Sequence, residues 1–142
     1  MRDAGQLTEH RHSTLRKVVL AGAAVEAGMR GLAYVPFDDG ESARGALSYV
    51  EAWWPLWAWA WVWFAVSAVI ALSIVIPRIA IPSMSIFVGI HLLWGSSYIA
   101  SWMFSDSPRS WVSGSSIMVI ALFGAVLTML IEKPTRTGLE GA

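Results

Sequence analysis

Three long apolar stretches follow one another in this sequence: Trp54–Ile76, Ile81–Phe104 and Trp111–Ile131. None of them contains Asp, Glu, Lys or Arg, and each holds roughly 21 to 24 residues. A helix rises about 1.5 Å per residue, so about 20 apolar residues are enough to cross a hydrocarbon core about 30 Å thick. A water-soluble domain cannot bury three such segments. The sequence therefore predicts a small integral membrane protein.

Short connections limit how these stretches are arranged. They are separated by Pro77-Arg78 and by Ser105-Asp106-Ser107-Pro108. Helices joined so briefly must run antiparallel, and lipid forces each backbone amide to pair within its own helix. The predicted fold is therefore an all-α membrane protein, with three antiparallel transmembrane helices in a domain of residues 53–131. Residues 132–142 form a polar tail.

The N-terminal region, residues 1–52, is more polar. Apolar residues recur there at spacings of three and four, which predicts one short helix over residues 13–33 and a juxtamembrane segment after it. The run is short and carries Glu26 and Arg30, so we expect no fourth span here. The pattern leaves open whether this helix packs on the bundle or lies at the membrane interface.

Composition excludes several classes of function. Ten basic residues balance ten acidic ones, so there is no positive surface of the kind that nucleic acid requires. The chain has no cysteine, which excludes disulfides, thiolate metal sites and a cysteine nucleophile. An active site needs convergent titratable groups, and here the charged residues are confined to tails and loops. The sequence predicts no enzyme, no cofactor and no metal, and the lipid bilayer as a partner.

The second stretch carries a row of residues at helical spacing. A small residue in such a row allows a neighbouring helix to approach closely, so we interpret it as a helix-packing stripe. No charged residue lies within any span to pair with its histidine. That favours a neutral, hydrogen-bonded packing histidine over a proton relay or a metal ligand, although in a homo-oligomer it would repeat around an axis and line a pore. The stripe consists of His91, Gly95, Tyr98 and Trp102.

Tryptophan is abundant, with nine in the chain and six of them between residues 53 and 63. Tryptophans at the end of a span are typical anchors at the interface between membrane and water. Trp61 and Trp63 lie about 12–15 Å further along the helix, so we expect them to pack against a partner helix. The predicted interface anchors are Trp53, Trp54, Trp57 and Trp111.

The distribution of basic residues predicts the orientation in the membrane. With the N-terminus in the cytoplasm, the basic residues of the N-terminal region lie inside, while Arg78, Lys133 and Arg136 lie outside. Residues close to a span nearly balance between the two sides. Counting the whole N-terminal region favours an N-terminus in the cytoplasm.

Three segments of the chain resemble a known group of proteins. They read Arg30–Pro36 (RGLAYVP), Ala46–Glu51 (ALSYVE) and Trp94–Ser113, where Trp94, Gly95, Tyr98 and Trp102 precede Pro108-Arg109-x-Trp111-Val112-Ser113. Over about residues 28–131, the chain resembles small, mostly uncharacterised three-span membrane proteins of tailed actinobacteriophages, often encoded near tail or lysis genes. The resemblance implies a multi-pass protein of the bacterial host's inner membrane. It carries over no catalytic residues.

Two roles remain open under this resemblance. The first is a phage-encoded membrane protein without enzymatic activity, which acts through helix–helix or protein–protein contacts as a homo-oligomer or with another phage or membrane protein. The alternative is a holin, which forms membrane lesions for host lysis. Small size, span number and small-residue helix faces fit a holin. The long N-terminal region and the absence of a strongly basic tail count against it.

Overall fold

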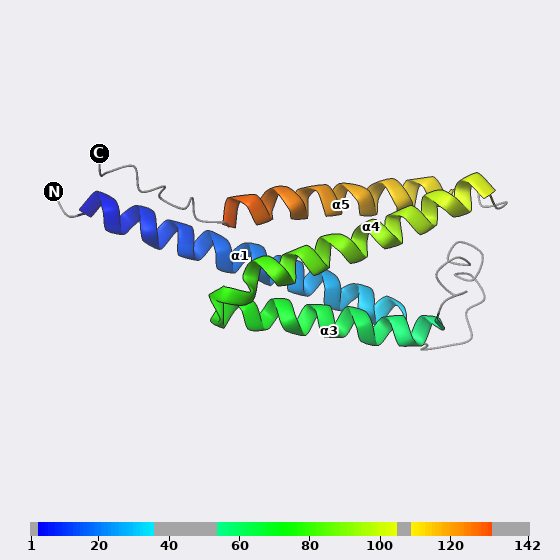
Figure 1. Ribbon diagram of the computed structural model, residues 1–142, viewed down its shortest axis with the longest axis horizontal. Helices are drawn as coiled ribbons and strands as arrows, with labels where there is room; N and C mark the ends of the chain where they lie inside the picture. The colour runs from blue at the N-terminus through cyan, green and yellow to red at the C-terminus, as the bar shows by residue number, and fades with distance from the viewer. Residues whose placement is uncertain (1–2, 36–53, 105–108, 132–142) are drawn as a thin grey trace, which may run out of the picture.

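The computed structural model describes residues 3–35, 54–104 and 109–131, with side chains described from residue 13 to residue 129 within those ranges. The regular structure of this part of the chain is entirely helical, which confirms the predicted fold class (Figure 1). A single 3₁₀ turn, η2, spans Pro77–Ile79. The α-helices are α1 (Asp3–Ala33), α3 (Leu56–Val75), α4 (Ala80–Phe104) and α5 (Ser110–Ile131).

Among the described residues, three helical segments are long and apolar enough to cross a membrane: Leu56–Val75, Pro77–Phe104 and Ser110–Met129. They coincide with the three stretches predicted from composition. These helices are therefore those of a multi-pass membrane protein, and lipid surrounds them.

Proline sets the limits of α3. Pro55 precedes the helix, and its carbonyl accepts the amide hydrogen of Ala58 at 2.9 Å. The missing N–H of a proline costs nothing at a helix start, where that group would be unpaired. At the other end Pro77 disfavours the helical conformation of the preceding Ile76, which has φ −107° and ψ 89°. The η2 turn then leads directly into α4.

The N-terminal helix differs from the sequence prediction in its length. It begins at Asp3 rather than at residue 13, and it contains 31 residues. Residues 3–12 include good helix formers such as Leu7, Glu9 and Arg11, and an acidic residue in the first turn interacts favourably with the helix dipole. This helix also packs on the bundle, which answers the question that the sequence left open.

The helices form two antiparallel pairs, α1 with α3 and α4 with α5 (Figure 1). Backbones approach most closely within each pair. A Cβ added to Gly95 of α4 would lie 3.2 Å from the Gly114 carbonyl oxygen of α5, and a Cβ on Gly31 of α1 would lie 2.7 Å from the Phe64 ring of α3. Between the pairs, larger side chains fill the space, including the fully buried Trp63 and Trp94.

Large apolar side chains are also exposed on the outside of every described α-helix. In water such a continuous apolar surface would be unfavourable, whereas in a bilayer it contacts lipid. Examples are Val25 and Met29 of α1, Val69 and Leu72 of α3, Leu92 and Leu93 of α4, and Leu122, Phe123 and Met129 of α5.

Candidate functional site

Three titratable side chains from two helices meet inside the bundle. Glu26 and Arg30 are four residues apart on α1 and therefore lie on one face of that helix. The Arg30 Nε donates a hydrogen bond to Glu26 Oε1 at 2.6 Å. The other carboxylate oxygen, Oε2, lies 2.8 Å from Nε2 of His91 on α4. Glu26 thus bridges a cation on its own helix and an imidazole on a helix of the other pair; we call these three residues the polar cluster.

His91 is fully buried, and both of its ring nitrogens have partners. Nδ1 lies 2.8 Å from the Phe87 carbonyl oxygen, one turn earlier in α4. A carbonyl and a carboxylate are both acceptors, whereas a neutral imidazole has a single N–H. Both contacts are hydrogen bonds when the pair shares one extra proton. That proton lies either on His91 beside an ionised Glu26 or on Glu26 beside a neutral His91.

Aromatic rings enclose the polar cluster. The Trp63 ring meets the His91 ring edge to face, with centroids 5.0 Å apart, and the Phe87 ring lies 4.1 Å from it. The Arg30 Cζ atom lies 5.9 Å from the Trp63 ring centroid, a cation–π distance. Apolar walls of this kind strengthen attraction between charges and make any unpaired charge costly.

Trp94 is the centre of a second set of contacts beside the cluster. Its indole N–H donates a hydrogen bond to the Tyr34 hydroxyl, which follows the end of α1. Its ring also lies 4.7 Å from Trp59 and 5.7 Å from Trp63 of α3. Each such ring pair contributes about 0.5–1.5 kcal/mol beyond the area it buries. We call the rings that join the two helix pairs the aromatic seam: Tyr34, Trp59, Trp63, Phe87 and Trp94.

The four residues of the predicted packing stripe meet different surroundings. His91 faces Glu26 of α1, while Gly95 faces α5 at Gly114 and Met118. Tyr98 packs half-buried against the core, and Trp102 is 49% exposed. The row therefore serves two separate helix contacts and ends on the outer surface.

The expectation that no charged residue pairs with His91 is wrong, because Glu26 does so from α1. Glu26 lies on α1, outside the three apolar stretches, which themselves contain no charged residue. One signal was available. Glu26 and Arg30, spaced for an ion pair, are the only charged residues in the otherwise apolar segment Val18–Val35.

The predicted interface tryptophans lie near one end of the molecule. Trp54 and Trp57 stand at the start of α3 and Trp111 at the start of α5, all of them exposed, and both helices begin at the same end (Figure 1). Trp53 lies outside the described residues. The two deeper rings differ, since Trp63 is fully buried whereas Trp61 is 68% exposed. The packing expected for Trp61 is therefore not found within the chain.

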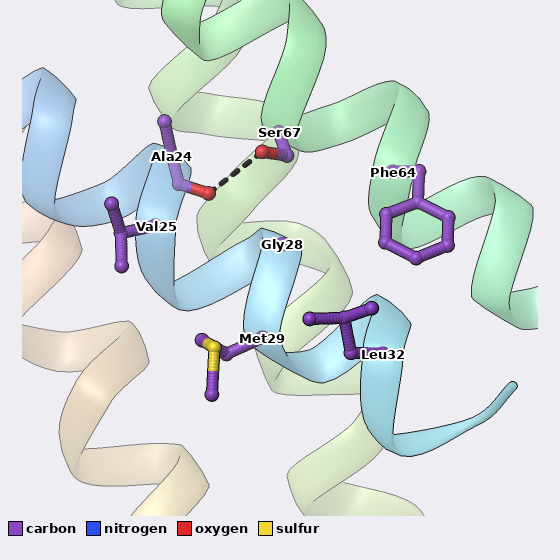
Figure 2. Close-up of a pocket in the computed structure, with 7 residues that line it drawn as sticks. All are labelled: Ala24, Val25, Gly28, Met29, Leu32, Phe64 and Ser67. Carbon is purple, nitrogen blue, oxygen red and sulfur yellow. Dashed lines mark hydrogen bonds between the residues drawn. The ribbon is translucent and has the colours of Figure 1, made fainter. Parts of the chain in front are cut away.

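An apolar groove of about 350 Å³ runs between α1 and α3 on the outer surface (Figure 2). Its polar lining group, the Ser67 hydroxyl, donates a hydrogen bond to the Ala24 carbonyl at 2.7 Å and so ties the two helices together. The lining residues are Ala24, Val25, Gly28, Met29, Leu32, Phe64 and Ser67.

Tyr34→Phe is expected to lower the free energy of unfolding by about 1–2 kcal/mol, because the buried Trp94 N–H loses its acceptor. Thermal unfolding in detergent, followed by far-ultraviolet circular dichroism, measures the change. Trp61→Phe, on the exposed face of α3, is the control and should change stability by less than about 0.5 kcal/mol. A Tyr34→Phe protein as stable as the wild type would contradict the importance of this bond.

Comparisons of the chain with protein-family models, with curated proteins and with solved structures find no match. Within the described residues, no group of three His, Cys, Asp or Glu side chains is placed to hold a metal ion.

Proposed function

We propose that this chain is a phage-encoded integral membrane protein of the bacterial host's inner membrane, which acts through helix contacts rather than through catalysis. The proposal is supported by the difference between the interior of the bundle and the outer faces of its helices. The charged groups that meet inside the bundle bond to one another, while the outer faces of the helices present apolar side chains. Such faces bind lipid or another helix.

A second copy of the chain, or another phage or membrane protein, is the proposed partner. Helix α5 offers a suitable surface because it packs mainly on α4 and leaves its other side uncovered. In a membrane, helices associate through packing rather than through the hydrophobic effect. The uncovered side carries Val119, Leu122, Phe123, Val126 and Met129.

One observation favours the holin as a second candidate. The two helix pairs are joined largely through side chains of the aromatic seam, and the polar cluster lies at this junction. If oligomerisation separated the pairs, Glu26, Arg30 and His91 would become available to line an aqueous lesion. A lesion needs polar groups of this kind inside a largely apolar protein.

Regulated expression in a bacterium separates the two candidates. Under the first proposal, cells continue to grow at high membrane levels of the protein and keep their membrane potential. A holin would stop growth abruptly after a delay, with loss of potential and release of a co-expressed muralytic enzyme. The Gly95→Leu variant, which should not pack α4 on α5, controls for the burden of overexpression. Abrupt lysis by the wild type alone would overturn the first proposal.

A further inference from the structure

Helix α1 lies beside the middle of two membrane-crossing segments. The Ser67 hydroxyl, near the middle of α3, bonds to the Ala24 carbonyl of α1. His91, near the middle of the span Pro77–Phe104, bonds to Glu26. The middle of a span lies near the middle of the bilayer, so this part of α1 is at the depth of the hydrocarbon core.

The outward face of α1 has the chemistry of a lipid-contacting surface. From Val18 onward its exposed residues are apolar, while Glu26 and Arg30 are directed to the interior and pair there. The helical part of this segment, residues 18–33, is about 24 Å long at about 1.5 Å per residue. Lys17 stands just before this segment, where its long side chain can reach the headgroups. The exposed apolar residues are Val18, Ala21, Gly22, Val25, Met29, Leu32 and Ala33.

We infer that residues 18–35 cross the bilayer as a fourth span, with the outward face of α1 and its groove against lipid acyl chains. The inference rests on the membrane assignment in the proposed function and is independent of the biological role. It replaces the expectation, drawn from length and charge, that this helix does not cross. The two charged residues do not prevent the helix from crossing, because Glu26 neutralises Arg30 and bonds to His91 within the bundle.

Four crossings place both termini on the same side of the membrane. In Figure 1, α1 begins, α3 ends and α5 ends at one end of the molecule, and the opposite helix ends lie together at the other. The α3–α4 turn therefore shares a side with both termini. The connection between α1 and α3 lies on the opposite side, together with the connection between α4 and α5.

This topology places most of the basic residues on one side of the membrane. Segments on the side of the termini carry seven of the ten lysines and arginines, those on the other side carry Arg44 and Arg109, and Arg30 lies in the bundle. Basic residues near spans are retained in the cytoplasm, so the side of the termini is cytoplasmic. The seven residues are Arg2, Arg11, Arg16, Lys17, Arg78, Lys133 and Arg136.

Single-cysteine labelling tests the topology directly, because the chain has no cysteine of its own. The variants are Ser13→Cys, Ser42→Cys and Thr137→Cys, labelled in bacterial spheroplasts with a membrane-impermeant maleimide. We expect Ser42→Cys to be labelled at least tenfold more than the other two, which should react only after permeabilisation. Val25→Cys, exposed on the outer face of α1, should stay unlabelled under both conditions.

The possible results distinguish the crossing of α1, the orientation and the membrane assignment. Labelling of positions 13 and 42 from the same side, or ready labelling of position 25, would overturn the fourth span. Labelling of positions 13 and 137 from outside and of 42 from inside would keep the crossing and overturn the orientation. Release of the protein from membranes by alkaline carbonate would instead overturn the membrane assignment on which the inference rests.

Discussion

Gly95→Leu is expected to force α4 away from α5 and to lower the free energy of unfolding by about 3 kcal/mol or more. A Cβ at this position would lie 2.9 Å from Met118 Cγ and 3.2 Å from the Gly114 carbonyl oxygen. The methionine can move, but the opposing backbone cannot, so the helices must separate. Overpacking of a core typically costs about 1–3 kcal/mol, and a clash with backbone lies at or beyond the upper end of that range.

Intrinsic tryptophan fluorescence during denaturation in mixed micelles measures this loss. Gly89→Leu is the matched control, since it makes the same substitution on the same helix at a glycine with open space around it. It should leave the protein at least as stable as the wild type, with a gain of up to about 1 kcal/mol because leucine has a higher helix propensity than glycine. His91→Gln should cost less than Gly95→Leu, because glutamine keeps a donor toward Glu26. Equal tolerance of leucine at positions 89 and 95 would contradict the crossing of α4 and α5 at Gly95.

The three spans could be predicted because freedom from charge over about 20 residues is a local property of the sequence. Which face of each span is buried could not be predicted in the same way. In a helix that is apolar on all sides, the sequence pattern does not indicate which side is buried. Trp61 and Trp63 illustrate this, because both are deep tryptophans of one span and only Trp63 is buried. The sequence patterns of the two residues are alike, and the packing of α1 and α4 decides between them.

The polar cluster was beyond prediction for a different reason. Glu26 and His91 are 65 residues apart, and they meet only because α1 packs on α3 through Gly28 and Gly31. Small residues on α1 were visible in the sequence, and they argue against a strongly bound interfacial helix, but they do not identify the helix against which α1 packs. A search for charges that pair with a buried histidine must therefore include amphipathic helices outside the obvious spans.

Glu26→Gln is expected to destabilise the bundle by about 3 kcal/mol. The substitution removes the only carboxylate that faces Arg30 and His91 among the described contacts, and loss of one member of a buried ion pair typically costs about 3–5 kcal/mol. We take the low end because the side chains of Glu26 and Arg30 are 27% and 22% exposed. Unfolding in mixed micelles, as for Gly95→Leu, measures the effect.

A double-mutant cycle assigns the loss to the contact with His91. The Glu26→Gln and His91→Leu substitutions should be non-additive by about 1–2 kcal/mol, because each removes the ionic hydrogen bond between these two side chains. Ser85→Ala provides the control, since its hydroxyl is exposed and bonds to the Ile81 carbonyl of its own helix. Glu26→Gln and Ser85→Ala should add within about 0.5 kcal/mol. Strict additivity in the first pair would contradict an energetic link between α1 and α4 at this point.

Replacing Glu26, Arg30 and His91 together by leucine then distinguishes a structural role from a functional one. Exchange of a complete buried ion pair for apolar residues is often neutral or stabilising, so the triple variant should recover most of the stability that Glu26→Gln loses. A bundle that folds as well without its charges has no structural need of them. If that variant also loses the phenotype of the wild-type protein in the host membrane, the polar cluster is retained for its charge rather than for stability.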